Sequence, residues 1–184
     1  MRLFIAVNFT DEIKNSLHNS VIKLKQAAAQ GSFTHRENLH LTLVFIGETD
    51  RAEAVKRAMD AVEALPFELS IGGFGKFKRG GKCIYWVGVE KSMALAALYA
   101  KLCGALEKQG FETEERDLSP HITLGRNVAA PPDFDESEFA KGVPRQSMRV
   151  GHISLMKSER TGGRLTYTEI YRKPLVSKGN HEYA

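Results

Sequence analysis

The chain has few of the residues that hold small secreted or metal-bound proteins together. Its 184 residues include only two cysteines, Cys83 and Cys103, and a single tryptophan. The two cysteines lie in apolar surroundings and match no close-spaced metal-binding pattern. With so few cysteines a disulfide scaffold is not expected, and the composition predicts a cytoplasmic location.

Long hydrophobic runs are also missing. No stretch approaches the ~20 apolar residues that a membrane-spanning helix needs. The opening segment, from Met1 to Phe9, becomes polar too quickly for a signal peptide and is more typical of a β-strand. We therefore expect no association with a membrane, and nothing in the sequence implies an obligate protein partner.

The rest of the composition is that of an ordinary globular protein. Hydrophobic residues make up 42% of the chain and charged residues 26%, so a sizeable core under a soluble surface is expected. The length suits one compact domain or two small lobes. A net charge of +4 favours polyanionic partners only weakly, so any affinity for phosphate must be argued from particular residues.

Apolar periodicity predicts alternating helices and strands. The second helix is expected to turn Ala61 and Leu65 inward and to stop before Pro66. Gly80-Gly81 and Gly162-Gly163 are typical of hairpin turns. The tail, 174–184, is polar. The predicted helices cover residues 10–28, 52–65, 93–109 and 134–141, and the predicted strands cover 1–9, 39–46, 67–71, 74–78, 82–89, 121–126, 148–157 and 165–172.

The second half of the sequence repeats a feature of the first. His40-Leu41-Thr42-Leu43 resembles His121-Ile122-Thr123-Leu124, and the two histidines lie 81 positions apart, at 40 and 121. A Gly-Gly turn follows each histidine at nearly the same offset. Matched features at one spacing indicate a duplicated lobe, roughly 34–90 and 114–172, within a single two-lobed domain over 1–184. We predict an α+β fold with pseudo-twofold symmetry.

Side-chain direction makes the repeated motif chemically suggestive. On a strand, alternate residues share a face, so each motif presents one imidazole and one hydroxyl on the same side. If the lobes meet across the pseudo-twofold axis, His40, Thr42, His121 and Thr123 converge. Two histidines near neutral pH can serve as a base and an acid, and threonine hydroxyls can donate hydrogen bonds to phosphate oxygens. These four side chains suit the metal-independent hydrolysis of a strained cyclic phosphate.

Two other interpretations of the motif stay open at this stage. A single histidine on a half-buried strand is more often structural than catalytic, so the hypothesis depends on both copies together. Zinc is a second possibility, because histidine is one of its common ligands. No acidic residue or cysteine accompanies the motifs at ligand-like spacing, however, and threonine is a poor ligand. We expect neither a metal nor a cofactor.

The motifs resemble those of the two-histidine phosphoesterases. Arg2 to Val7, Asn38 to Glu48 and Ser119 to Arg126 narrow the resemblance to the bacterial and archaeal RNA 2′,3′-cyclic phosphodiesterases, once named 2′-5′ RNA ligases. The resemblance extends to about Lys173. It implies two antiparallel sheets flanking a central cleft, with helices outside, and a substrate that is RNA ending in a 2′,3′-cyclic phosphate. The expected product is a 2′-phosphomonoester.

The resemblance also implies roles for single residues. His40 would be the proton donor and His121 the proton acceptor, whereas the repeat by itself makes them nearly equivalent. Arg126 would bind phosphate with Thr42 and Thr123. Strict alternation places Arg126 on the face opposite His121, so it reaches the site only if the strand bends or bulges near Gly125.

The first hairpin mixes aromatic and basic residues, a combination typical of single-strand binding. Phe77 and Lys82 are therefore candidate nucleotide contacts, and one of Tyr85 and Trp86 is expected to be core while the other faces the site.

Two functional alternatives remain: a phosphodiesterase for small cyclic nucleotides, and a non-catalytic RNA- or nucleotide-binding module. The physiological RNA, the base preference and the oligomeric state do not follow from the sequence, nor does the importance of reversible 2′-5′ ligation.

Overall fold

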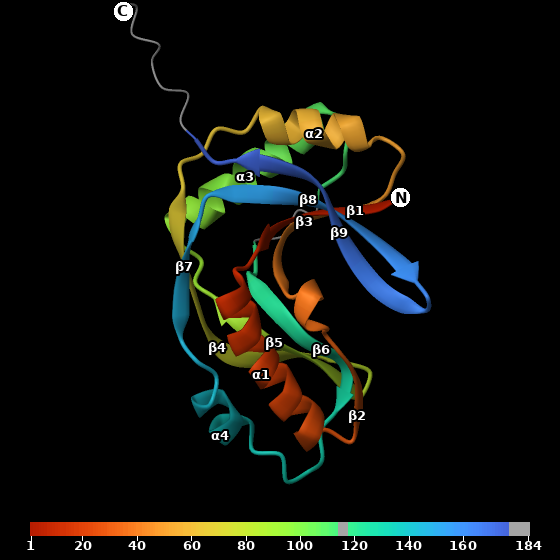
Figure 1. Cartoon of the computed structure of the whole chain (residues 1–184), viewed down its shortest axis with the longest axis vertical. Helices are drawn as coiled ribbons and strands as arrows, with labels where there is room; N and C mark the ends of the chain where they lie inside the picture. The colour runs from red at the N-terminus through yellow and green to blue at the C-terminus, as the bar shows by residue number, and fades with distance from the viewer. Residues whose placement is uncertain (114–117, 177–184) are drawn as a thin grey trace, which may run out of the picture.

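Two antiparallel sheets form the framework of the protein, whose computed structural model describes residues 1–113 and 118–176 (Figure 1). One sheet has the strand order β3-β1-β8-β9 and the other β2-β6-β5-β4-β7. The predicted α+β class and its two antiparallel sheets are confirmed. The strands are β1 Arg2–Asn8, β2 Gln30–Phe33, β3 His40–Glu48, β4 Phe67–Arg79, β5 Lys82–Val89, β6 His121–Ala129, β7 Gln146–Val150, β8 His152–Thr161 and β9 Arg164–Pro174.

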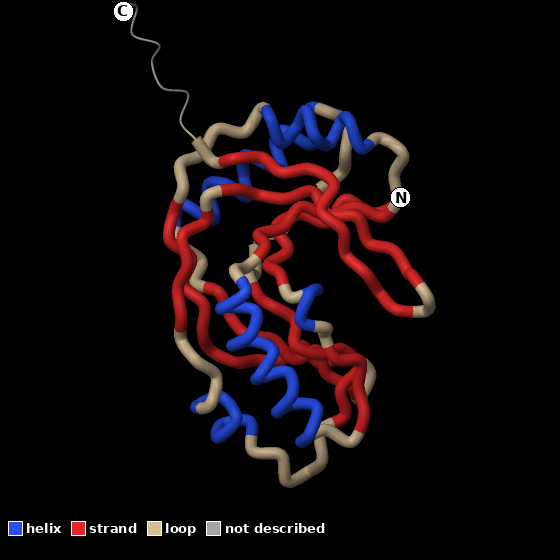
Figure 2. Tube along the Cα trace, in the orientation of Figure 1, coloured by secondary structure: helices blue, strands red, loops and turns tan. Residues whose placement is uncertain are grey.

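The helices lie outside the sheets. In Figure 2, α2 and α3 are at the top beside the four-stranded sheet, and α1 and α4 are in the lower half beside the five-stranded sheet. Thr10 caps α1 by accepting a hydrogen bond from the backbone N–H of Ile13. The bounds are α1 Asp11–Ala27, α2 Ala52–Asp60, α3 Met93–Lys108 and α4 Glu136–Lys141, with a short 3₁₀ helix, η1, over Arg36–Asn38.

One hydrophobic core joins both sheets to the helices. It contains Leu41 and Leu43 from the first motif and Ile122 and Leu124 from the second, all of them buried. A second, small cluster of Phe4, Ala6 and Met156 lies apart from this core and packs against Tyr167. The apolar residues of each motif therefore fix its strand in the core and leave the histidine and the threonine on the other face.

Both Gly-Gly pairs form the predicted hairpin turns. Gly80 and Gly81 have φ of 51° and 78°, and Gly162 and Gly163 have φ of 58° and 80°. Two consecutive residues in this left-handed region suit two-residue hairpin turns, which explains the demand for glycine. The turns join β4 to β5 and β8 to β9, and the β8–β9 hairpin extends well away from the rest of the molecule (Figure 1).

The chain crosses between the sheets after each motif. The β4–β5 hairpin follows the first motif strand, β3, yet β5 pairs with the second motif strand, β6. The β8–β9 hairpin follows β6, yet β8 pairs with β1, which in turn pairs with β3. The sheet that contains each motif strand thus also contains strands from the other half of the chain.

Three local predictions are wrong. The helix expected over 52–65 ends at Asp60, and Ala61 and Leu65 are exposed rather than inward, Leu65 by 64%. Residues before Pro66 are biased toward extended backbone, and the side chain of Val62 is buried without a helix. The single strand expected over 148–157 is divided at Gly151, where the chain leaves one sheet for the other.

Some elements have no counterpart in the prediction. The strand β2 and the helix η1 were not expected, because both are short and polar. The strands expected over 67–71 and 74–78 form one strand, β4, whose pairing with β5 shifts between Ile71 and Phe74. The end of the predicted polar tail, 177–184, and the start of the second repeat, 114–117, lie outside the described residues.

None of the described helices is both long and apolar enough to span a bilayer.

Candidate active site

The same irregularity occurs in both motif strands. In β3, the partner of Ile5 is Val44 and that of the next residue, Ala6, is Thr42, so Leu43 is an extra residue. In β6, Tyr85 pairs with Gly125 and Trp86 with Thr123, so Leu124 is the extra residue. A bulge reverses the alternation of side chains beyond it. The fifth residue after each histidine is therefore turned to the same face as that histidine.

Hydrogen bonds at both ring nitrogens orient His40. Its Nδ1 lies 2.7 Å from the backbone oxygen of Asn38, and its Nε2 lies 2.8 Å from Oγ1 of Thr42. A carbonyl only accepts, so Nδ1 carries the proton and Nε2 accepts from the threonine hydroxyl in the neutral ring. Nε2 is therefore the nitrogen through which the His40 ring would act on a phosphate, and it lies next to the hydroxyl of Thr42.

Aromatic rings enclose His40 on its other sides. The ring of Phe4 lies 4.9 Å away and the ring of Tyr167 lies 5.2 Å away, almost perpendicular to the imidazole. The pKa of His40 is lowered from 6.5 to about 4, mainly by this burial and in smaller part by the charges of Arg126, Lys14 and His121. The hydrogen bond to Asn38 opposes the shift. In the protein without substrate, His40 is neutral at pH 7.

His121 is oriented in the same way and enclosed less. Its Nδ1 lies 2.8 Å from the backbone oxygen of Ser119, two residues earlier, as in the first motif. Phe77 lies edge-on at 5.1 Å, and Trp86 lies 6.2 Å away. The Thr34 hydroxyl donates a 2.8 Å hydrogen bond to the backbone oxygen of Thr123 and so ties the loop after β2 to the motif strand. Both imidazoles thus have the same tautomer, fixed by the backbone.

The bulge turns Arg126 toward the face that carries the motif histidines. Leu124 and Gly125 are both buried, so the next residue, Arg126, returns to the face of His121 and Thr123. Its side chain is exposed, and its positive charge acts on both His40 and Tyr167 across the two sheets. This is the bend near Gly125 that the sequence requires if Arg126 is to lie with the motif residues.

Four of the predicted residues lie together, whereas Lys82 lies apart from them. His40, Thr42, His121 and Arg126 are connected by hydrogen bonds or by their effects on the pKa of His40. Lys82 is exposed at the end of the first hairpin, opposite Arg79, and no contact within the described residues links it to a histidine.

Two aromatic residues of the first hairpin, Phe77 and Trp86, lie beside His121. Phe77 is 37% exposed and contacts the His121 ring. The expected division between Tyr85 and Trp86 is confirmed: Tyr85 is buried in the core, and Trp86 lies beside His121. The indole ring of Trp86 lies on Gly75, where an added Cβ would come within 2.4 Å of it.

Sequence reasoning missed Tyr167 and Phe4. Tyr167 comes from β9, 127 positions after His40, and its ring packs against both His40 and Phe4. Burial, as the main cause, raises the pKa of Tyr167, while the charges of Arg126 and Arg2 oppose that shift. The available signal was the alternation of β9, which sets Leu165, Tyr167 and Glu169 on one face, but alternation does not reveal which strand lies beside it.

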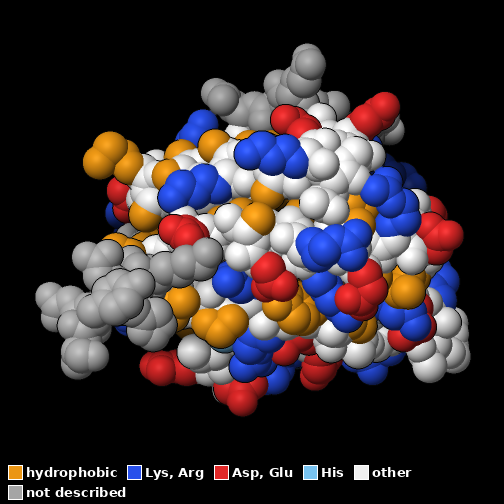
Figure 3. Space-filling view, turned by 90° about the horizontal axis from the view of Figure 1, so that it is seen from above, with side chains coloured by type: hydrophobic (Ala, Val, Ile, Leu, Met, Phe, Trp, Pro, Cys, Tyr) orange, Lys and Arg blue, Asp and Glu red, His pale blue; other side chains and the backbone are white. Residues whose placement is uncertain are grey.

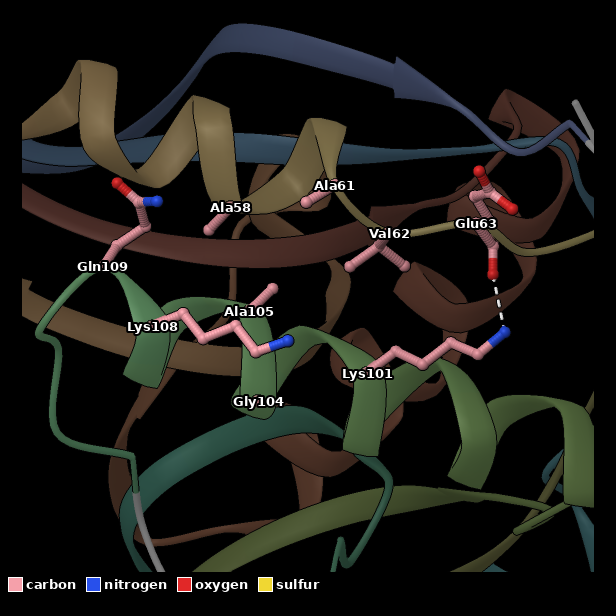
Figure 4. Close-up of a pocket in the computed structure, with 9 residues that line it drawn as sticks. All are labelled: Ala58, Ala61, Val62, Glu63, Lys101, Gly104, Ala105, Lys108 and Gln109. Carbon is pink, nitrogen blue, oxygen red and sulfur yellow. Dashed lines mark hydrogen bonds between the residues drawn. The ribbon is translucent and has the colours of Figure 1, made fainter.

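Other described parts of the surface show fewer features of a functional site. The pocket between α2 and α3 in Figure 4 is lined by small and charged residues, among them Ala58, Gly104 and Lys101, and holds none of the predicted site residues. The face seen from above in Figure 3 mixes Lys and Arg with Asp and Glu rather than gathering one sign. Within the ranges 1–113 and 118–176, no three His, Cys, Asp or Glu side chains are grouped as metal ligands.

Comparisons with known proteins point to one family. The model of the 2'-5' RNA ligase superfamily matches residues 11–162. The RNA 2',3'-cyclic phosphodiesterase of Thermotoga maritima is 37% identical over 176 residues, which cover 93% of this chain and 94% of that protein. Its namesake from Methanothermobacter thermautotrophicus is 34% identical, over 92% of this chain and 96% of that protein. The crystal structure of E. coli LigT complexed with 3'-AMP matches with a TM-score of 0.78 at 25% identity, over 96% of this chain and 98% of that one.

Proposed function

This chain belongs to the 2'-5' RNA ligase superfamily, and on that premise we propose that His40 and His121 open terminal 2′,3′-cyclic phosphates of RNA by acid–base catalysis. Family membership and the names of the relatives support the cyclic phosphodiesterase activity. The geometry of the site supports the roles of single residues. The observation that carries them is the pair of equally oriented imidazoles, close enough for His121 to affect the pKa of His40.

The reaction needs one proton removed and one supplied. His121 takes a proton from water through Nε2 as the water oxygen attacks phosphorus. The bond from phosphorus to the 3′-oxygen breaks, and His40 gives its Nε2 proton to that oxygen. The products are a 2′-phosphomonoester and a 3′-hydroxyl. Each proton transfer is worth ~10²–10⁴-fold in rate, and Thr42, Thr123 and Arg126 stabilise the charge on the non-bridging oxygens.

The donor role of His40 requires that the substrate restore its proton. A pKa of about 4 leaves the ring neutral at pH 7 in the free protein. A phosphate anion beside the ring favours the imidazolium and offsets the nearby positive charge of Arg126. We therefore expect the pKa of His40 to rise when a cyclic phosphate binds, so that the acid forms only on the loaded enzyme.

Joining RNA ends through a 2′-5′ linkage is the same opening of the cyclic phosphate, with a 5′-hydroxyl of a second RNA end in place of water as the nucleophile. We propose it as a secondary activity. It needs no further residue, because His121 takes the proton of the attacking hydroxyl and His40 protonates the departing 3′-oxygen, as in hydrolysis.

The test is hydrolysis of an RNA oligonucleotide that ends in a 2′,3′-cyclic phosphate, in excess EDTA. We expect the parent protein to form the 2′-phosphate and His40→Ala and His121→Ala to lose several powers of ten in rate. His18→Ala, a histidine substitution on α1, is the matched control and should retain activity. If the parent binds the RNA but leaves the ring closed, even with divalent metal ions restored, the protein is a binding module instead.

A second substrate distinguishes the roles of the two histidines. Sulfur in place of the 3′-oxygen makes a leaving group that needs no proton. Such a cyclic phosphorothiolate should restore much of the rate of His40→Ala and little of that of His121→Ala. The opposite pattern would reverse the assignment of donor and acceptor. Relative rates on an oligonucleotide and on a nucleoside cyclic phosphate would show whether small nucleotides are the better substrates.

A further inference from the structure

The β4–β5 hairpin carries a row of side chains on the face of His121. Phe77 on β4 lies against the His121 ring, and Arg79, two residues further along β4, shares its face. On β5, Trp86 lies 5.3 Å from Phe77, and Lys82 is the strand partner of Arg79. Directly opposite residues of an antiparallel pair lie on the same face. The row therefore leads from His121 over two aromatic rings to two cations beside the turn.

Arg79 and Lys82 lie opposite each other without a counter-charge. Both are exposed, and within residues 1–113 and 118–176 neither forms an ion pair with a carboxylate. On the other face of the hairpin, by contrast, Lys76 forms an ion pair with Glu136. Like charges directly opposite one another in a sheet are destabilising, and an anion between them relieves the repulsion. This end of the row is therefore suited to a phosphate group.

Phe77 differs in exposure from Phe4, the ring beside His40. Phe4 is buried, whereas Phe77 is 37% exposed and belongs to neither hydrophobic cluster. An exposed aromatic ring beside cations is the combination that holds single-stranded nucleic acid. Residues two apart on a strand are separated by roughly 7 Å, a length that one nucleotide of an extended strand can span. A base stacked on Phe77 thus brings its neighbouring phosphate to Arg79 and Lys82.

The geometry of the reaction decides which RNA lies on this side. In displacement at phosphorus, the attacking and leaving oxygens lie roughly in line, on opposite sides of the phosphorus atom. In the proposed mechanism His40 protonates the leaving 3′-oxygen, so the RNA whose end is cyclic lies on the His40 side. His121 takes the proton of the nucleophile, so the molecule that carries the nucleophile lies on the His121 side. Water needs no site for a chain, but a second RNA that supplies a 5′-hydroxyl does.

We propose that Phe77, Arg79 and Lys82 bind the 5′-hydroxyl end of a second RNA strand, the acceptor in 2′-5′ joining. This rests on the proposed function. The first base of the acceptor stacks on Phe77, and its first phosphodiester lies between the two cations. The 5′-oxygen attacks phosphorus and gives its proton to His121, while the bond from phosphorus to the 3′-oxygen breaks and His40 protonates that oxygen. The product is a 2′-5′ phosphodiester next to a free 3′-hydroxyl.

The partition between joining and hydrolysis gives the sharpest test. An RNA that ends in a 2′,3′-cyclic phosphate is mixed with an RNA that begins with a 5′-hydroxyl, and the ratio of joined to hydrolysed product is measured. We expect Phe77→Ala to lower this ratio about tenfold or more and Phe77→Trp to restore it. With methanol as the acceptor, the ratio of methanolysis to hydrolysis should not change, because methanol is too small to reach the hairpin. Lys78→Gln, an exposed lysine on the other face of the same hairpin, is the matched control and should behave as the parent does.

An acceptor with an uncharged linkage tests the two cations. The acceptor is a dinucleotide with either a phosphodiester or a methylphosphonate between its two nucleosides. We expect Arg79→Gln and Lys82→Gln to lower the joining ratio several-fold with the phosphodiester and to leave it unchanged with the methylphosphonate. Equal losses with both acceptors, or an equal loss in methanolysis, would overturn the acceptor site.

Binding can be followed without catalysis, because the single tryptophan of the chain, Trp86, lies beside Phe77. In the His40→Ala background, an RNA with a 5′-hydroxyl and no terminal phosphate should change the tryptophan fluorescence. The RNA concentration needed should rise with Phe77→Ala or Arg79→Gln and stay the same with Lys78→Gln. An unchanged titration in Phe77→Ala means that no acceptor strand binds here. If the parent opens no cyclic phosphate, the proposed function fails, and this titration still decides whether the hairpin binds RNA.

Discussion

The low pKa of His40 should make the stability of the protein depend on pH in a way that one substitution removes. In the folded protein this pKa is about 4, against 6.5 for an exposed histidine. Between these values the unfolded chain takes up a proton at position 40 and the folded protein does not. The contribution of His40 to the free energy of unfolding is therefore fully present above pH 6.5 and is lost as the pH falls toward 4.

The size of the effect follows from the two pKa values. At pH 5 the linkage relation gives a loss of ~2 kcal/mol in the free energy of unfolding relative to pH 7, and near pH 4 about 3 kcal/mol. A glutamine at position 40 does not titrate. The parent should therefore lose ~2 kcal/mol more than His40→Gln between pH 7 and pH 5. Other titrating groups, including His152, are common to both proteins and cancel in the difference.

Urea unfolding of the parent and of His40→Gln at several pH values between 7 and 4.5 supplies the measurement. NMR titration of the His40 ring is an independent one, and adding phosphate should move the pKa upward. Parallel stability curves for the two proteins, or a ring that titrates near 6.5, would refute the account of an enclosed, neutral His40. The proposal that substrate restores its proton would then lose its basis.

Three further predictions concern neighbouring groups. Arg126→Ala should lower kcat/KM ~10²–10³-fold and raise the pKa of His40, since the charge of Arg126 now lowers it; an unchanged NMR titration would show that Arg126 lies too far away. Thr42→Val removes the hydroxyl that meets Nε2 of His40 and should lower kcat/KM ~10²–10³-fold, about the share of one such donor, with little change in Tm. Glu136→Ala leaves the buried hydroxyl of Tyr85 without its acceptor and should cost ~1–3 kcal/mol in urea unfolding at unchanged kcat.

The sequence predicts the motif strands well because their alternation is strong and their inward residues are all aliphatic. Leu41, Leu43, Ile122 and Leu124 are buried as expected. Alternation also fails at a definite point. Beyond Thr42, Leu43 and Val44 are both buried because β3 has an extra residue in its pairing with β1. Such a bulge has no local sequence pattern from which it could be predicted.

A different reason explains why the environment of His40 could not be predicted. Tyr167 is distant in the sequence and reaches His40 only because β9 joins the sheet through β8. Strand order across a sheet is decided by packing of the whole chain rather than by local propensity. The same limit applies to Phe45, whose strand was predicted but whose exposure was not.

The crossing of the chain between the sheets also bears on what a fragment of the protein can do. If the chain is divided between α3 and β6, the first piece holds β5 without the strand that covers one of its edges, and the second holds β8 without β1. Neither piece can complete a sheet, so each should remain unfolded or aggregate through its open edges. Mixed together, the two pieces should reassemble. Loss of either piece would therefore remove both histidines from service at once, and no shortened product could retain half of the site.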